Sequence, residues 1–128
     1  MQINFKLWIE NDGGELIIGE GILKLLSIIK QKGSISKAAE ELNMSYRTAW
    51  GKLKKLESRL GCELIEKRAG GKDGGGTILT VDGEELLEKY NSLYQKTETF
   101  VQEQFDQLFK TPYSGIAECE ASNNNDEG

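Results

Sequence analysis

Two helical patterns separated by a very short connection limit the fold of this chain more than any other feature of its sequence. Residues 34–42 carry small and apolar side chains on one side, and either Ser34 or Ser36 can cap the start of this short helix. Residues 46–60 repeat apolar side chains at helical spacing, with Ser45 as the N-cap. Two helices joined by about three residues predict a helix-turn-helix. The positions expected to face inward are Ala38, Ala39, Leu42, Ala49, Leu53, Leu56 and Leu60.

The segments on either side of this pair extend the pattern. Alternating apolar residues over 3–9, a turn at residues 11–14 and a second strand pattern over 15–18 predict an N-terminal β-hairpin. Residues 22–32 then predict a helix that ends at Gly33. After the helix pair, residues 64–68 and 77–79 predict two short strands joined by a glycine-rich segment. A helix-turn-helix followed by such a hairpin is a winged helix.

The last helical pattern runs from about residue 81 to residue 109, with Thr80 as its N-cap. A helix of this length would measure about 40 Å, which is longer than a domain of this size can cover. We therefore expect its apolar stripe to pair with a second copy of the chain in a homodimer. The expected interface residues are Leu86, Tyr90, Leu93, Tyr94, Thr97, Phe100 and Val101.

These patterns together predict a mainly α fold with a small β content. It is a winged helix-turn-helix with an N-terminal β-hairpin and a long C-terminal dimerisation helix. We expect residues 1–110, including that helix, to form one domain, and residues 111–128 to form a disordered acidic tail.

Composition removes several classes of function. The 128-residue chain has no histidine, which excludes a Ser-His-Asp or Cys-His nucleophile and a histidine-ligated zinc site. The only two cysteines, Cys62 and Cys119, are far apart in sequence, so a disulfide framework is not expected. Acidic pairs show no spacing that differs from a solvated helix face. With no apolar run of about 18–20 residues and no signal-peptide pattern, we expect a cytoplasmic protein that is not an enzyme.

Charge is distributed unevenly along the chain. The whole chain has a formal charge of −5, yet residues 30–72 contain 11 basic and 5 acidic residues, a net charge of +6. A basic segment inside an acidic protein is expected of a surface that meets phosphates. The alternative is a solvated helix with scattered lysines.

One stretch then resembles a known family. Residues 33–50, GSISKAAEELNMSYRTAW, are similar to the winged helix-turn-helix of the ModE family of molybdate-responsive repressors. The glycine-rich wing, the segment LTVDG at 79–83, LWI at 7–9 and GEG at 19–21 agree with it, so the resemblance covers about residues 3–95. The LysR-type DNA-binding domain is a broader relative.

The resemblance implies a sequence-specific transcriptional regulator that binds double-stranded DNA at a pseudo-palindromic operator as a homodimer. ModE repressors also carry a C-terminal molybdate-binding region, for which this chain has no room, so we expect no bound cofactor and leave any small-molecule effector open. A second interpretation is a winged-helix module that binds another protein without reading DNA. Residues 82–128, with 3 basic and 11 acidic residues, would suit a basic partner.

In a helix-turn-helix, the second helix enters the major groove with its N-terminus first. Arg47 stands there and can bind guanine O6 and N7, which is worth ~1–3 kcal/mol of discrimination. Lys52 and Lys55 share a face with Thr48 and suit phosphates, whereas Lys54 lies on another face. The expected DNA contacts are Ser34, Ser36, Ser45, Tyr46, Arg47, Thr48, Lys52, Lys55, Arg68 and Lys72.

Two further positions on this helix are open to more than one interpretation. Trp50 is expected in the core, because large aromatic residues on such helices usually pack there. Gly51 costs ~0.8–1.0 kcal/mol relative to alanine inside a helix, and a close approach of DNA or of another helix would explain it.

Overall fold

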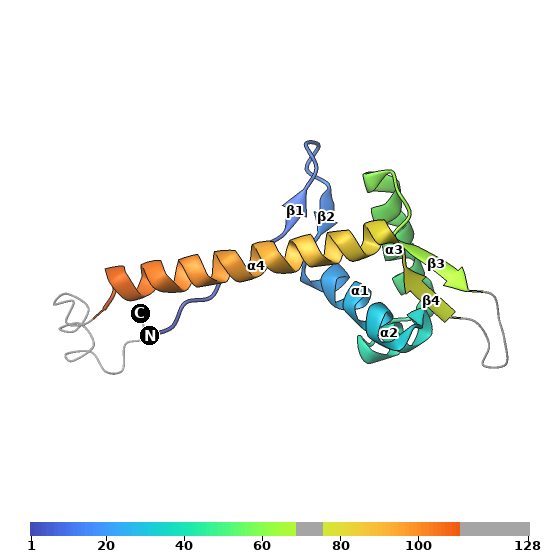
Figure 1. The fold of residues 1–128 in the computed structure, drawn as a ribbon, viewed down its shortest axis with the longest axis horizontal. Coiled ribbons are helices and arrows are strands. Elements are labelled where there is room, and N and C mark those ends of the chain that lie inside the picture. The colour runs from blue at the N-terminus through green and yellow to red at the C-terminus, as the bar shows by residue number, and fades with distance from the viewer. Residues whose placement is uncertain (69–75, 111–128) are drawn as a thin grey trace. The chain divides into compact units, whose positions relative to one another are not determined.

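The computed structural model of the chain describes residues 1–68 and 76–110. Figure 1 shows its helices and strands in chain order. They are β1 (Ile9–Glu10), β2 (Leu16–Ile18), α1 (Glu20–Lys32), α2 (Ile35–Glu41), α3 (Tyr46–Leu60), β3 (Ile65–Arg68), β4 (Gly76–Leu79) and α4 (Val81–Leu108). β1 pairs with β2 and β3 pairs with β4, each as a two-stranded antiparallel sheet. The predicted winged helix-turn-helix with an N-terminal hairpin is confirmed.

The chain divides into two compact units. One is Lys6–Ser92, and the other combines Met1–Phe5 with the chain from Leu93 onward. The continuous helix α4 contributes residues to both units. The sequence-based domain of residues 1–110 stays a prediction, and its tail of residues 111–128 lies outside the described residues.

The larger unit has its core between α1, α2 and α3. Ala38 and Ala39 are buried on α2, and their small side chains allow this helix to pack closely on its neighbours. Ser34, not Ser36, caps α2, because its Oγ accepts a hydrogen bond of 3.0 Å from the backbone N–H of Lys37. Other fully buried side chains of this core are Ile18, Leu25, Leu26, Ile29, Ile35, Leu53 and Leu64.

The N-terminal strand is shorter than predicted. Only Ile9–Glu10 pair with β2, and residues 1–8 form no strand. β2 has only three residues because Gly19, in an extended conformation, already caps α1. The helix predicted over residues 22–32 therefore begins earlier, at Glu20. Leu60, expected to face inward, is exposed at the end of α3.

Backbone hydrogen bonds hold the base of the β3–β4 wing against the helices. The N–H of Thr77 donates to the carbonyl of Gly33 at 2.9 Å, and the N–H of Thr80 donates to the carbonyl of Leu64 at 2.9 Å. The Thr80 hydroxyl accepts from the N–H of Gly83 at 3.0 Å, which confirms its predicted role as the cap of α4. The wing is therefore fixed to the helix-turn-helix at its base.

The first turns of α4 are part of the core of the larger unit. Tyr90 is only 1% exposed, and its hydroxyl donates to the carbonyl of Leu7 at 2.5 Å. The expectation that Tyr90 lies in a dimer interface is therefore wrong. At the level of Tyr90, the apolar stripe of α4 packs against its own chain.

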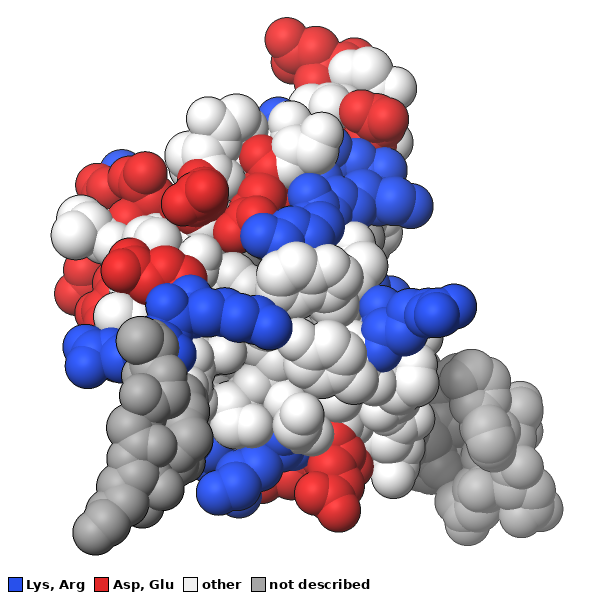
Figure 2. All heavy atoms as spheres, turned by 90° about the vertical axis from the view of Figure 1, so that its right-hand side faces the viewer, with Lys and Arg blue, Asp and Glu red and all other residues white. Residues whose placement is uncertain are grey.

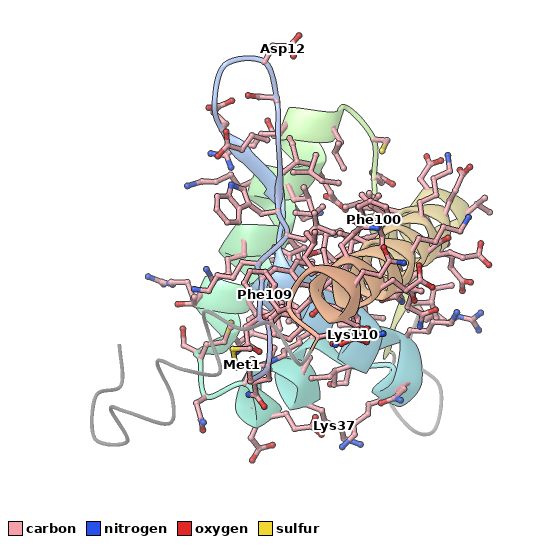
Figure 3. The ribbon with its side chains drawn as sticks, turned by 90° about the vertical axis from the view of Figure 1, so that its left-hand side faces the viewer. Met1, Asp12, Lys37, Phe100, Phe109 and Lys110 are labelled. Atoms are coloured by element: carbon pink, nitrogen blue, oxygen red, sulfur yellow. The ribbon has the colours of Figure 1, made fainter. Side chains whose placement is uncertain are left out.

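The smaller unit contains the later turns of α4. The ring of Phe5 stacks on Tyr94 with 5.2 Å between centroids, so Tyr94 is already half-covered by its own chain. By contrast, Leu93 is 44% exposed and Phe100 is 60% exposed. Figure 3 looks toward this end of α4 and places Phe100 and Phe109 on different sides of the helix. Part of the apolar stripe therefore remains open to solvent.

Candidate nucleic-acid interface

The first turn of α3 is exposed and rigidly capped. Tyr46, Arg47 and Thr48 all carry exposed side chains, with Tyr46 at 42%. The Oγ of Ser45 accepts the N–H of Thr48 at 3.1 Å and donates to the Thr48 hydroxyl at 3.0 Å. Both hydrogen-bonding functions of Ser45 are thus used within the protein, so capping is its role in this structure. The first turn presents its side chains in a fixed geometry.

One flank of α3 forms a basic groove with the segments that precede it in the chain. The groove, of about 380 Å³, is lined by apolar Ile17, Ile22 and Leu56 together with polar and charged residues of α3. Arg59 also lies 3.9 Å from the carboxylate of Glu15 in the hairpin. The α3 residues lining the groove are Arg47, Thr48, Gly51, Lys52, Lys55, Leu56 and Arg59. Four cations around an apolar floor give this flank a positive potential.

A second hollow lies where α2, α3 and the wing meet. It brings together Ser34 and Ser36 from the start of α2, Tyr46 from α3 and Arg68 from β3. The structure thus gathers the predicted DNA contacts into two groups, except Ser45, which lines neither hollow, and Lys72, which lies outside the described residues. Figure 2 shows the face that contains α3 and the wing, where lysine and arginine side chains surround uncharged surface and acidic side chains lie mainly along its margins. The DNA-contact roles themselves stay predictions.

The other flank of α3 carries a cluster of aromatic rings and ammonium groups. The ring of Trp50 is nearly parallel to that of Tyr46, with 6.3 Å between centroids. Lys67 of β3 donates from Nζ to the Tyr46 hydroxyl at 3.0 Å and lies 4.9 Å from the Trp50 ring centroid. Trp50 is only half-buried, so the expectation of a core position is wrong. We refer to Tyr46, Trp50, Lys54 and Lys67 as the aromatic-cation cluster.

Sequence reasoning missed the role of Lys67 and, for Lys54, predicted only that it lies on a different face from Lys52 and Lys55. Lys54 lies 4.4 Å from the Trp50 ring centroid and pairs with the carboxylate of Glu57 at 3.0 Å. A pair of aromatic residues four positions apart on a helix, next to basic residues, was the available signal. The basic partner on β3 depends on tertiary structure and had no local signal.

Glu57 is a buried acid within the basic segment. Its Oε2 accepts the backbone N–H groups of Leu64 at 2.7 Å and Ile65 at 3.2 Å, while its Oε1 accepts from Lys54. Burial alone would raise the pKa of this carboxyl, but the hydrogen bonds from Leu64, Lys54 and Ile65 outweigh burial, so the pKa lies below its ordinary value. The charged carboxylate therefore fixes the start of β3 to α3.

Gly51 lies on the exposed side of α3. Among the described residues, no atom outside its own helical neighbourhood lies within 4 Å of the position a Cβ would take. Close packing against another helix is therefore not the reason for this glycine within the described part of the chain. The alternative of a close approach by DNA stays open.

The described residues contain no group of three or more acidic, cysteine or histidine side chains arranged to hold a metal ion. Within the same residues, the helices lack the combination of length and apolar character that a membrane crossing requires.

Comparison with known proteins places residues 22–84 in one family. They match the model described as bacterial regulatory helix-turn-helix protein, lysR family. The chain is 40% identical over 83 residues to the transcriptional regulator ModE of Haemophilus influenzae, covering 65% of this chain and 32% of the relative. It is 37% identical over 73 residues to the DNA-binding transcriptional dual regulator ModE of Escherichia coli K12, covering 57% and 28%. The chain thus spans about a third of the length of these relatives.

Solved structures agree on the fold. The CbnR_DBD chain of a CbnR_DBD–DNA complex aligns with a TM-score of 0.53 and 22% identity, over 70% of this chain and 98% of that one. Vibrio fischeri DarR, solved in complex with DNA, aligns with a TM-score of 0.52 and 20% identity, over 70% and 29%. Because the matched family consists of regulatory proteins, it also agrees with the expectation that the chain is not an enzyme. Residues 22–84 therefore match the bacterial regulatory helix-turn-helix model of the lysR family, and the sequence of the chain is ModE-like.

Proposed function

We propose that this chain is a sequence-specific transcriptional regulator that binds double-stranded DNA at a pseudo-palindromic operator as a homodimer. The observation that carries the proposal is the exposed, capped first turn of α3, which lies between a basic groove on one flank and the wing on the other. An exposed helix N-terminus with an arginine and flanking cations fits the major groove of a duplex.

Within this proposal the side chains divide into two roles. Arg47 reads a base edge, because it stands in the first turn and its guanidinium can bind guanine at two atoms. Lys52 and Lys55 lie further along α3 in the basic groove and bind phosphates, which position the protein without reading sequence. Ser34, Ser36 and Arg68 line the hollow beside the wing and suit the neighbouring phosphates.

The experiment is selection of bound sequences from random DNA, followed by affinity measurements on the selected site. Arg47→Ala should reduce the preference for the selected site over random DNA by about 10-fold or more. Lys52→Ala should weaken binding to both DNAs to a similar extent and make the logarithmic salt dependence shallower by about 0.9. Lys24→Ala, an exposed α1 lysine outside the two groups, is the matched control. Equal losses on both DNAs for Arg47→Ala would contradict the assigned role.

The homodimer would form through the open side of α4. Leu93 and Phe100 are exposed and lie on the same side of the helix as half-buried Leu86 and Thr97. The two exposed apolar side chains are seven residues apart, with Thr97 between them at intervals of four and three, and this spacing fits a helix–helix interface. Two recognition helices related by a two-fold axis would read half-sites about 34 Å apart or a multiple of this distance.

Sedimentation equilibrium tests the dimer. Phe100→Glu should shift the chain toward monomer. It should lower the affinity for an operator with two half-sites more than the affinity for a single half-site. Glu98→Lys, an exposed position two residues before Phe100 and so on the opposite side of α4, controls for a general effect of charge. A chain that is monomeric at all concentrations and still selects a palindrome would contradict the proposal.

A second function is favoured by the same open side of α4, which could hold a different protein. In that case the winged helix would be an interaction module without direct DNA readout. Random-DNA selection discriminates the two, because an interaction module would enrich no sequence.

We further propose that this chain binds no cofactor, including molybdate. One relative, the molybdenum-pterin-binding protein MopB of Rhodobacter capsulatus, is 37% identical over 76 residues, which cover 28% of its length. Molybdate titration followed by the fluorescence of Trp8 and Trp50 tests the proposal, and a saturable change would contradict it.

The cytoplasmic location stays a prediction.

A further inference from the structure

We propose that Trp50 is a positioning residue that couples the wing to the recognition helix α3, so that DNA contacts made by these two elements depend on one another. The proposal rests on the proposed DNA-binding function. Its basis is the aromatic-cation cluster, which joins α3 to β3 through side chains.

The cluster is held from both elements. Two ammonium groups lie near the Trp50 ring, that of Lys54 in α3 at 4.4 Å and that of Lys67 in β3 at 4.9 Å from the ring centroid. Lys67 also donates to the Tyr46 hydroxyl, and the Tyr46 ring stacks on Trp50. Cations over aromatic faces are attracted by the ring quadrupole, and Trp is the strongest partner. Trp50 is therefore the centre of a contact network that crosses from α3 to β3.

A second link fixes the other end of the same strand. Glu57 accepts the N–H groups of Leu64 and Ile65 at the start of β3, and its other oxygen binds Lys54. β3 spans only Ile65–Arg68, so links near its two ends determine both its position and its direction. Because Lys54 contacts both Glu57 and Trp50, the two links form one connected unit.

The two elements that this unit joins each carry an expected DNA contact next to a cluster residue. Arg47 follows Tyr46 directly in α3, and Arg68 follows Lys67 directly in β3. A displacement of the wing would therefore move Lys67 away from Tyr46 and disturb the turn that presents Arg47. Trp50 itself is uncharged and half-buried, so its removal takes away the link without taking away a phosphate-binding charge.

The test is a double-mutant cycle on the selected DNA site, using Arg47→Ala and Arg68→Ala in the full chain. With Trp50 present, the affinity loss of the double variant should differ from the product of the two single losses by about threefold or more. In the Trp50→Leu background, the losses should multiply to within about twofold. Trp8→Leu removes the other tryptophan, which lies outside the cluster, and should leave the coupling unchanged.

Other outcomes overturn the proposal. Coupling between Arg47 and Arg68 that persists in the Trp50→Leu background refutes the proposal, even if the affinity for DNA falls. A fall in affinity without loss of coupling would mean that Trp50 only contacts DNA or only stabilises the fold. Additive losses in the unmodified chain also refute it. If Trp50→Leu does not fold, Lys67→Met keeps the aliphatic stem, removes the ammonium group and should abolish the coupling equally. If the chain selects no DNA sequence at all, the proposed function is refuted. If it selects a sequence but shows no coupling, only the role of Trp50 is refuted.

Discussion

Replacement of Gly83 by alanine tests the packing at the junction of the wing and α4. An ideal Cβ at Gly83 would lie 2.2 Å from the carbonyl oxygen of Leu64 and 3.1 Å from its carbonyl carbon. This carbonyl cannot easily retreat, because it accepts the N–H of Thr80 at 2.9 Å. The N–H of Leu64 donates a hydrogen bond to the Glu57 carboxylate, and the Leu64 side chain is fully buried. Either the start of α4 or the start of β3 must therefore move.

The expected change in the free energy of unfolding combines one stabilising and two destabilising contributions. Alanine in a helix is favoured over glycine by ~0.8–1.0 kcal/mol. Overpacking against a fixed backbone costs about 1–3 kcal/mol, and loss of the Thr80–Leu64 hydrogen bond costs about 0.5–1.5 kcal/mol. We expect Gly83→Ala to lower the free energy of unfolding by about 1–3 kcal/mol.

Gly51→Ala is the matched control, because it makes the same substitution inside a helix where no neighbouring described atom lies within 4 Å of the added Cβ. It should raise the free energy of unfolding by ~0.8–1.0 kcal/mol. Urea denaturation followed by far-ultraviolet circular dichroism measures both variants. Equal stability of Gly83→Ala and the unmodified chain, or effects of the same sign at the two glycines, would refute the reasoning.

Three further predictions concern single side chains. Ser45→Ala should lower the free energy of unfolding by about 1 kcal/mol, whereas Ser36→Ala, which removes no cap, should have little effect in the same denaturation assay. Glu57 has a folded-state pKa below its unfolded value, so it stabilises the fold above the unfolded pKa and loses this effect as pH falls through the folded pKa. Melting temperatures between about pH 7 and about pH 3 should therefore fall less for Glu57→Gln than for the unmodified chain. Tyr90→Phe should cost about 0.5–1.5 kcal/mol through its lost hydrogen bond, and an unchanged sedimentation profile would separate this effect from dimerisation.

The recognition helix could be predicted from sequence because both of its ends carry local signals. Ser45 caps the first turn with its own hydroxyl, and Gly61 ends the helix with a φ of 76°, a conformation that favours glycine. These choices depend on residues within one turn of each end. The observed bounds, Tyr46–Leu60, are the predicted ones.

Elements that depend on distant partners could not be predicted in the same way. The alternation over residues 3–9 is typical of a strand, but a strand needs a partner of matching length, and β2 offers only Leu16–Ile18. The apolar periodicity around Tyr90 fits a dimer interface and a core position equally well. Only its hydrogen bond to Leu7, 83 residues earlier in the chain, decides between them. The prediction of a core position for Trp50 is wrong for the same reason, because its contact with Lys67 comes from another element.

Several cations of the basic segment are already paired with carboxylates in the structure. Lys30 and Lys32 pair with Glu84 and Glu41, and Lys54 pairs with buried Glu57. Exposed pairs are weak and open readily, but a buried carboxylate that also fixes two backbone N–H groups holds its lysine more firmly. Among the described residues, the structure shows no ion pair for three of the four cations of the α3 groove, Arg47, Lys52 and Lys55, whereas Arg59 lies near Glu15. Three cations without a carboxylate partner among the described residues therefore lie together on the flank of α3 away from the aromatic-cation cluster, while the cluster uses its own lysines to hold the wing.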